Sequence, residues 1–252
     1  MYRLVRGKVE SYLLNEIGKY GKIQLTLIDP EGLDGETASR MAREAEAAGS
    51  TGIMVGGSTI VSPLELDEAV KAIKSSVNIP VILFPNNVSG ISRYADAIWF
   101  MSLLNSFDPY FLIGAQMLGA PLVRRYGLEP IPMGYIVIGE GSAVSLIGHA
   151  KPIPPDKPKI AAAYALAAQY LGMRFVYLEA GSGAEKPIPA ETITAARKIL
   201  DIPLIVGGGI RSGEQARVVA EAGADIIVTG TVIEKEGSEK IGEIVRSIRS
   251  GA

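Results

Sequence analysis

The expected fold is decided by the stretch Phe175-Val176-Tyr177-Leu178-Glu179-Ala180-Gly181-Ser182-Gly183. It begins with an apolar run, which is typical of a buried strand, and it ends in a glycine-rich loop. Parallel α/β proteins build their active sites from the loops that follow the carboxyl ends of their strands. We therefore predict that Glu179 lies at the mouth of a parallel sheet. A solvated glutamate in a simple turn fits this short motif equally well, so the rest of the chain has to decide between the two.

Seven further apolar runs alternate with helical patterns on either side of this stretch. The eight predicted strands are residues 23–28, 52–55, 80–84, 97–101, 133–138, the run that begins at 175, 204–206 and 225–228. The predicted helices are residues 8–20, 36–48, 63–76, 109–126, 159–171, 190–200, 213–222 and 238–250. Apolar strands that alternate with helices are typical of a parallel sheet covered on both faces. Eight such units predict an α/β fold of the (β/α)8 TIM barrel type, with an amino-terminal helix and residues 1–252 as one domain.

Two connections depart from this regular alternation. Residues 88–94 are too few for a full helix between the third and fourth strands, and residues 152–158 hold four prolines, which predict a loop. A doubly wound open sheet is the alternative fold. The dinucleotide-binding form of that fold carries G-x-G-x-x-G after its first strand, and its absence at that point favours the barrel.

The composition excludes several classes of chemistry. The chain has 252 residues, of which 48% are hydrophobic, and a formal net charge of -2, which gives no indication of a nucleic-acid partner. It has no cysteine and a single histidine, His149, so disulfides, thiolate metal sites and multi-histidine zinc sites are excluded. The amino terminus does not resemble a signal peptide, and no run reaches the roughly 18 apolar residues of a membrane span. We expect a soluble, cytoplasmic protein without a transmembrane segment.

Glycine-rich loops follow the seventh and eighth predicted strands. The first carries Gly208 and Gly209, and the second carries Gly230 and Thr231. In (β/α)8 enzymes these two loops often bind a phosphate group through backbone N–H groups, and glycine lets the backbone approach the oxygens closely. We predict a phosphate site here; the alternative is a pair of tight turns that only close the barrel. Arg211 is left out, because an arginine at a helix start is more often solvated.

A carboxylate also closes the first predicted strand. Asp29 is followed by Pro30, and Ser58 follows the neighbouring second strand. Mg²⁺ takes hard oxygen ligands, often with only one or two from the protein and the rest from phosphates and water. Without histidine or cysteine partners, an oxygen-only site favours Mg²⁺ over zinc. A common Asp-Pro turn without a metal is the alternative interpretation.

These motifs, taken in order, resemble the geranylgeranylglyceryl phosphate synthase family over nearly the whole chain. The resemblance rests on Thr26-Leu27-Ile28-Asp29-Pro30-Glu31-Gly32, Val55-Gly56-Gly57-Ser58-Thr59, Phe84-Pro85-Asn86-Asn87, Tyr94-Ala95-Asp96-Ala97, Tyr177-Leu178-Glu179-Ala180-Gly181-Ser182-Gly183, Gly207-Gly208-Gly209-Ile210-Arg211 and Thr229-Gly230-Thr231. The family is a prenyltransferase family of ether-lipid, and therefore phospholipid, biosynthesis. The resemblance implies a (β/α)8 enzyme that joins sn-glycerol 1-phosphate to geranylgeranyl diphosphate with Mg²⁺ and releases pyrophosphate.

The resemblance also implies roles for individual residues. Asp29 and Ser58 would hold the metal that carries the diphosphate, and Glu179 would be the catalytic base. Tyr177 is the second predicted catalytic residue, which would orient the glycerol hydroxyl or line the path of the allylic cation; a core aromatic on a strand is the alternative interpretation. The residues that would bind glycerol phosphate are Tyr177, Leu178, Glu179, Ala180, Gly181, Ser182, Gly183, Gly208, Gly209, Gly230 and Thr231. A branch of the family has lysine two residues before the metal aspartate, where this chain has Leu27. That difference resembles the branch that contains hexamers, so we expect a homo-oligomer, either a dimer or a hexamer.

A prenyl tail would need an apolar groove beside the third and fourth strands. The candidates to line it are Phe84, Trp99, Phe100, Tyr110 and Phe111, although strand alternation prevents Trp99 and Phe100 from both facing inward.

Two other functions remain open from the residues alone. One is a sugar-phosphate isomerase or aldolase that uses the same phosphate loops, although an aldolase would want a lysine at a strand end and no predicted strand ends in lysine. The other is a non-catalytic phosphate-binding barrel, which would not require Asp29 and Glu179 at the mouth.

Overall fold

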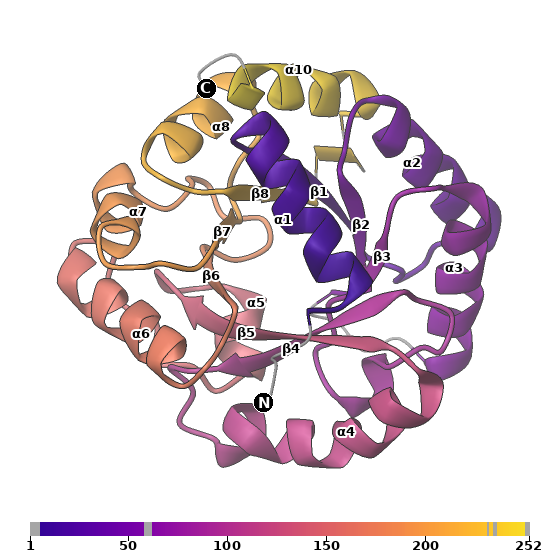
Figure 1. Cartoon of the computed structure of the whole chain (residues 1–252), viewed down its shortest axis with the longest axis horizontal. Coiled ribbons are helices and arrows are strands. Elements are labelled where there is room, and N and C mark those ends of the chain that lie inside the picture. Colours follow the sequence, from indigo (N-terminus) through magenta and orange to yellow (C-terminus); the bar gives the residue numbers. More distant parts are fainter. Residues whose placement is uncertain (1–5, 58–61, 231, 234–235, 250–252) are drawn as a thin grey trace.

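The computed structural model describes residues 6–57, 62–230, 232–233 and 236–249, and within them eight parallel strands form a closed barrel (Figure 1). The strands are β1 (Ile23–Ile28), β2 (Gly52–Val55), β3 (Val81–Leu83), β4 (Ala97–Leu103), β5 (Glu129–Val137), β6 (Phe175–Glu179), β7 (Leu204–Gly207) and β8 (Ile226–Thr229). Each strand pairs with the next in the sequence, and β8 pairs with β1. The predicted (β/α)8 barrel is confirmed, whereas the extent of the domain over residues 1–252 stays a prediction.

Helices form the outer layer around this ring of strands (Figure 1). They are α2 (Gly35–Ala47), α3 (Pro63–Ser76), α4 (Ala115–Tyr126), α6 (Pro158–Tyr170), α7 (Ala190–Arg197), α8 (Gly213–Glu221) and α10 (Ser238–Arg249). The short helix α5 (Ala143–Ile147) follows β5 and lies inside this ring of helices (Figure 1). Between β3 and β4 the chain forms only a 3-10 turn, η1 (Val88–Gly90), as the short connection predicted. In the described residues no helix is both long and apolar enough to span a bilayer.

The amino-terminal helix α1 (Lys8–Tyr20) lies across the amino-terminal end of the barrel (Figure 1). Its first turn is held by Glu129 at the start of β5, whose carboxylate accepts the backbone N–H groups of Val9 and Glu10, each at 2.8 Å. The Glu10 carboxylate, only 1% exposed, pairs with Arg174 at 2.8 Å. Val9 and Leu13 belong to the cluster of apolar residues inside the barrel. This helix therefore closes the end of the barrel opposite the loops that follow the strands, and its prediction is confirmed.

Strand β5 begins four residues before the predicted start at residue 133, although Pro130 and Pro132 lie in it. Proline lacks the N–H that a central strand normally donates. The neighbouring β6 begins only at Phe175, which pairs with Met133, so both prolines lie beyond the part of β5 that pairs with β6, although β4 pairs with both of them. The carbonyl oxygen of Pro132 still accepts the N–H of Arg174 at 3.0 Å. The predicted start of β5 at residue 133 was wrong, because β5 pairs with β4 from Glu129 onward although it pairs with β6 only from Met133.

Two helical features were also mispredicted. The long helix predicted at residues 109–126 begins as a π-helical turn, η2 (Tyr110–Gly114), and only then becomes α4. The short helix α5, capped by Ser142, was missed altogether because five residues are too few to show a helical period. Both features lie after strand ends, on the side of the barrel where the candidate site residues lie.

Alternation along each strand separates two apolar clusters. One fills the barrel interior and includes Trp99, Tyr135 and Tyr177, and the other lies between the barrel and its helices and includes Leu178 and Ile98. Successive side chains of a strand point to opposite faces, so neighbours in sequence fall into different clusters. On β6 this alternation directs Tyr177 and Glu179 inward and Leu178 outward.

Candidate active site

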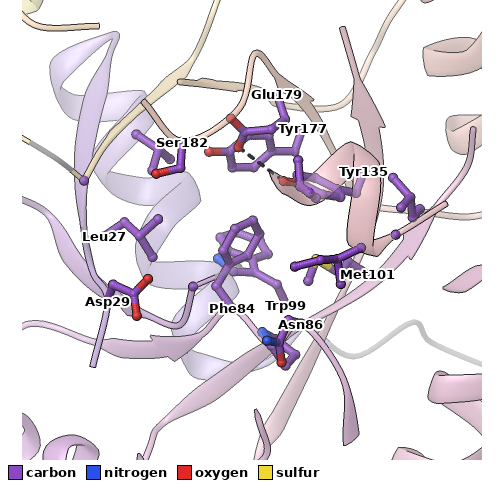
Figure 2. A pocket seen from close by; sticks show the side chains of 18 of the residues that line it. Leu27, Asp29, Phe84, Asn86, Trp99, Met101, Tyr135, Tyr177, Glu179 and Ser182 are labelled. Atoms are coloured by element: carbon purple, nitrogen blue, oxygen red, sulfur yellow. Dashed lines mark hydrogen bonds between the residues drawn. The ribbon is translucent and has the colours of Figure 1, made fainter. Parts of the chain in front are cut away.

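The carboxyl ends of the strands enclose a cavity of about 500 Å³ (Figure 2). Every strand, or the loop that follows it, contributes to the wall. The contributions include Asp29 after β1, Gly57 after β2, Phe84 to Asn87 after β3, Met101 on β4, Tyr135 on β5, Tyr177 and Glu179 on β6, Gly208 and Gly209 after β7, and Thr229 and Gly230 at the end of β8. The sequence motifs that lie far apart in the chain are thus brought together at one end of the barrel.

Glu179 is held in this wall by two hydrogen bonds and is only 6% exposed. Its Oε1 accepts the backbone N–H of Gly181 at 2.5 Å, and its Oε2 accepts the hydroxyl of Tyr135 at 3.3 Å (Figure 2). Burial raises the pKa of the carboxyl, while the N–H of Gly181 and the hydroxyls of Tyr177 and Tyr135 act in the opposite direction. A carboxylate with a raised pKa is a stronger base than a solvated one, and this one is fixed in position.

Three aromatic rings pack against one another, and two of them carry hydroxyls that face the carboxylate of Glu179. The ring of Phe84 stacks on Tyr177 with centroids 5.5 Å apart, and Tyr135 meets both rings edge-on at 5.5 Å and 5.2 Å. Burial, with the nearby charge of Glu179, raises the pKa of both tyrosine hydroxyls well above the ordinary value. Both hydroxyls therefore stay protonated and act as donors toward Glu179.

The loop after β7 approaches the loop after β6 closely because it is made of glycine. Gly208 has φ +85° and Gly209 has φ +70°, which are left-handed conformations that glycine adopts without strain. A Cβ at position 208 would lie 2.6 Å from Glu179 Oε1 and 2.8 Å from backbone atoms of Gly181. The loop leads into α8, whose amino terminus is capped by Ser212. This backbone, together with Gly230 at the end of β8, forms the wall expected of a phosphate site.

The predicted residues of the β6 loop do not all reach the cavity. Ser182 and Gly183 line the cavity, and Gly181 donates its backbone N–H to the carboxylate of Glu179. Leu178 is fully buried in the layer between barrel and helices, and Ala180 packs against the same layer. Their side chains point away from the cavity because they alternate with Tyr177 and Glu179. Thr231 and Ser58, predicted for phosphate and metal, lie outside the described residues.

Asp29 lies across the cavity from Glu179 (Figure 2). Its Oδ1 accepts the backbone N–H of Glu31 at 3.1 Å, and its Oδ2 lies against Gly57, where any Cβ would collide with it. Burial raises the pKa of Asp29, the N–H of Glu31 lowers it, and the charge of Glu31 raises it further. Ionised Asp29 is therefore costly unless a cation lies nearby.

The donor set around Asp29 fits Mg²⁺. Asp29 and Glu31 both line the cavity and offer only hard oxygen atoms. In the part of the chain that the structure describes, no three histidine, cysteine, aspartate or glutamate side chains cluster as a metal site. Mg²⁺ commonly uses one or two carboxylates and completes its shell with phosphate oxygens and water, so one or two carboxylates at an open cavity suit it.

The cavity continues away from Glu179 as an apolar arm between β4 and α4. Four of the five predicted aromatic candidates line it, namely Phe84, Trp99, Phe100 and Phe111. Trp99 belongs to the cluster inside the barrel and Phe100 packs against the outer cluster, so the two face opposite sides as predicted. The arm also contacts Ala115 and Gly119 of α4 and Ile91 beside η1.

Two residues of the site were missed or set aside in the sequence. Tyr135 lies within an apolar run and looks like an ordinary core aromatic; only its pairing with Tyr177 across β5 and β6 reveals its contact with Glu179. Arg211 lines the cavity, and its guanidinium donates to the carbonyl oxygens of Gly183 at 3.2 Å and Ala184 at 3.0 Å. This arginine connects the loop after β7 to the loop after β6.

Comparison with known proteins agrees with this arrangement. A family model described as the PcrB family matches residues 16–248. Over 246 residues the chain is 58% identical to the geranylgeranylglyceryl phosphate synthase of Thermococcus gammatolerans, and the match covers 97% of each chain. The chain belongs to the PcrB family.

Other relatives of this PcrB family chain carry the same name. The geranylgeranylglyceryl phosphate synthase of Thermofilum pendens is 55% identical over 250 residues, covering 98% of each chain. The crystal structure of (S)-3-O-geranylgeranylglyceryl phosphate synthase from Thermoplasma acidophilum in complex with its substrate sn-glycerol-1-phosphate superimposes with a TM-score of 0.92. That structure is 44% identical and covers 98% of this chain and 100% of its own. The family predicted from the sequence is confirmed, and its hexamer-containing branch stays a prediction.

Proposed function

We propose that this protein is a geranylgeranylglyceryl phosphate synthase, a prenyltransferase of ether-lipid biosynthesis. It joins the hydroxyl of sn-glycerol 1-phosphate to the allylic carbon of geranylgeranyl diphosphate and releases pyrophosphate. The observation that carries the proposal is the position of Glu179. This buried carboxylate lies between a glycine-lined wall suited to a phosphate group and an apolar arm suited to a long hydrocarbon tail.

Glycerol phosphate binds on the glycine-lined side of the cavity. Its phosphate accepts backbone N–H groups from the loops of Gly208, Gly209 and Gly230, with Thr231 as a further proposed contact. Glycine at these positions lets the backbone approach the phosphate, and the start of α8 adds the positive end of a helix dipole. On the β6 side, Ser182 and Gly183 contact the glycerol, and Tyr177 lies beside the reacting hydroxyl.

Glu179 acts as the general base. Its Oε1 is held by the N–H of Gly181, so Oε2, which faces the hydroxyl of Tyr135, is the oxygen that takes the proton. As the bond forms between the glycerol oxygen and the allylic carbon, the bond from that carbon to the diphosphate breaks and its electron pair leaves with pyrophosphate. The proton of the glycerol hydroxyl passes to Glu179 in the same process. Removal of that proton prevents the newly formed C–O bond from breaking again.

Asp29 would hold Mg²⁺ together with the oxygens of the diphosphate, and Ser58 is a further proposed ligand. The bound ion would neutralise charge that develops on the leaving pyrophosphate. Through that ion, Asp29 would hold the diphosphate end of the substrate on the side of the cavity opposite Glu179. The aromatic rings of Phe84, Tyr135 and Tyr177 exclude water from the reacting carbon, which would otherwise be hydrolysed.

We also propose that the enzyme works in the cytoplasm as a homo-oligomer, a dimer or a hexamer, without a nucleic-acid partner. Large exposed apolar side chains on η2 and the start of α4 support the oligomer. Ile113, Met117 and Leu118, on η2 and α4, are 65%, 63% and 52% exposed. Sedimentation equilibrium of the purified protein would distinguish a monomer from a dimer or a hexamer.

The proposed reaction is tested by incubating the protein with sn-glycerol 1-phosphate, geranylgeranyl diphosphate and Mg²⁺, then measuring pyrophosphate release and the mass of the lipid product. We expect prenylated glycerol phosphate and pyrophosphate in equal amounts. The enantiomer, sn-glycerol 3-phosphate, is the matched control and should react much more slowly. Absence of a prenylated product with every allylic diphosphate would favour the sugar-phosphate alternative instead.

A further inference from the structure

A cluster of buried polar side chains lies on the outer side of β1 and β8. Gln24 and Thr26 of β1 and Thr229 of β8 are 0%, 0% and 3% exposed. Their strand neighbours Leu25 and Val228 belong to the apolar cluster inside the barrel, so these three side chains point outward, toward the helices. On β2, β3, β6 and β7 the outward positions are apolar, namely Ile53, Val55, Val81, Leu83, Val176, Leu178, Leu204 and Val206. Polar groups are costly in such a layer unless they are hydrogen-bonded.

The side-chain amide of Gln24 connects the two strands. Its Nε2 donates to Oγ1 of Thr229 at 2.8 Å and to Oγ1 of Thr26 at 3.1 Å. An amide nitrogen carries two N–H groups, so both bonds form at once. The hydroxyl of Thr26 donates to Oγ of Ser50 at 3.1 Å, and the hydroxyl of Ser50 donates to the carbonyl oxygen of Gly52 at 3.1 Å. A continuous chain of hydrogen bonds therefore runs from the start of β2 to the end of β8.

Thr229 stands where β8 reaches the cavity. The pairing of β1 with β8 ends at Thr26 opposite Thr229. Gly230 follows directly and lies close to β1, since a Cβ built on it would be 3.5 Å from the carbonyl oxygen of Leu27. Thr229 and Gly230 both line the cavity. Gln24 thus bonds to the last paired residue of β8, immediately before the backbone proposed to bind phosphate.

The N–H groups of a backbone phosphate site must be held in place, because hydrogen bonds weaken steeply when their distance or angle changes. Without the amide of Gln24, the hydroxyl of Thr229 would lose its donor in a buried layer, a loss that a shift of the strand end would relieve. We propose that Gln24 is a positioning residue, which fixes the end of β8 and with it the backbone of Gly230 that binds the phosphate of sn-glycerol 1-phosphate. The proposal rests on the proposed function, because it takes this wall as the phosphate site.

The test is the affinity of Gln24→Leu for sn-glycerol 1-phosphate, measured by calorimetric titration and as KM in the prenyl-transfer assay. We expect the dissociation constant and this KM to rise roughly 10-fold, the effect of one buried hydrogen bond. At saturating sn-glycerol 1-phosphate, kcat and the KM for geranylgeranyl diphosphate should stay within about twofold of the wild type, since Glu179 and the apolar arm are unchanged. Ser50→Ala is the matched control. It removes a hydrogen bond from the other end of the same cluster and should lower the melting temperature without changing the dissociation constant.

A double variant separates positioning from stability. Thr229→Val keeps the shape of the side chain and should by itself raise the dissociation constant by a similar factor. Gln24→Leu combined with Thr229→Val replaces both partners by apolar groups, which is nearly neutral for folding. Its melting temperature should return toward that of the wild type, while its dissociation constant stays as high as in either single variant, because the bond between the strands is absent in all three.

Two results would overturn the inference. One is a wild-type dissociation constant in both single variants. The other is a dissociation constant that returns to the wild-type value together with the melting temperature in the double variant, which would leave Gln24 a structural role only. In either case the wild-type protein still forms the prenylated product, so the proposed function stands. If the wild-type protein forms no prenylated product at all, the proposed function fails, and the inference fails with it.

Discussion

Replacing Glu179 by glutamine tests the general base with little change in shape. The amide oxygen of glutamine can keep the hydrogen bond from the N–H of Gly181, which the carboxylate accepts at 2.5 Å. The amide nitrogen then faces the hydroxyl of Tyr135, which can rotate and accept instead of donate. The variant also removes a buried charge, so we expect its melting temperature at neutral pH to equal or exceed that of the wild type.

The expected fall in kcat follows from the role of Glu179 as a general base. General-base catalysis by a positioned side chain contributes about 100- to 10,000-fold, so kcat should fall by that factor, or by about 3 to 5 kcal/mol in activation free energy. Because glutamine keeps the shape of the wall and the backbone loops bind the phosphate, the dissociation constant of sn-glycerol 1-phosphate should change less than about threefold, within the effect of one modest hydrogen bond.

The assay combines single-turnover product formation with calorimetric titration of sn-glycerol 1-phosphate. Glu185→Gln, an exposed position on the same loop, is the matched control and should behave like the wild type. Turnover within a few-fold of the wild type in Glu179→Gln would refute the role of Glu179 as base. Loss of glycerol phosphate binding together with turnover would instead assign Glu179 to binding.

Three further predictions concern the groups around this base. Tyr135→Phe removes a hydrogen bond that favours the ionised form of Glu179, so the pKa of the Glu179 carboxyl should rise. The acid limb of the pH profile of kcat/KM should therefore move to higher pH. An unchanged profile would contradict the contact between Tyr135 and Glu179. Asp29→Asn should require at least about 10-fold more Mg²⁺ for half-maximal activity, since a charged ligand is lost, and an unchanged magnesium titration would remove the metal role. Gly208→Ala should raise the KM for glycerol phosphate and lower kcat, because its Cβ would meet Glu179 Oε1 at 2.6 Å. Gly141→Ala is the control for backbone strain, since Gly141 has φ +84° but no neighbour within 4 Å among the described residues; equal effects of the two variants would contradict a specific role for Gly208.

The fold was largely predictable because apolar strands and amphipathic helices leave clear periods in the sequence. The runs at β1, β2 and β6 were placed correctly. The errors lie where local patterns are short or where a partner decides the outcome. Helix α5 is too short to show a period, and β5 extends back over two prolines because its other neighbour, β4, pairs along its whole length.

The site was predictable only in part for a similar reason. Glu179 and Gly208 lie at strand ends, and a carboxylate or a glycine-rich loop at such a position can be recognised in the sequence. Tyr135 does not, because its function depends on a partner 44 residues away that only the pairing of β5 with β6 brings into contact. Leu178 was assigned to the substrate because it lies inside a motif, whereas the alternation of the strand turns its side chain toward the helices.

The central claim is that Glu179 takes the proton of a glycerol phosphate bound on the glycine-lined wall. A crystal structure of this protein with sn-glycerol 1-phosphate bound tests it most directly. We predict the reacting hydroxyl at hydrogen-bond distance from Oε2 of Glu179, about 2.6 to 3.2 Å, and the phosphate on the backbone of Gly208, Gly209 and Gly230. A bound molecule with its phosphate elsewhere, or with no hydroxyl within reach of Glu179 directly or through one water, would contradict the account.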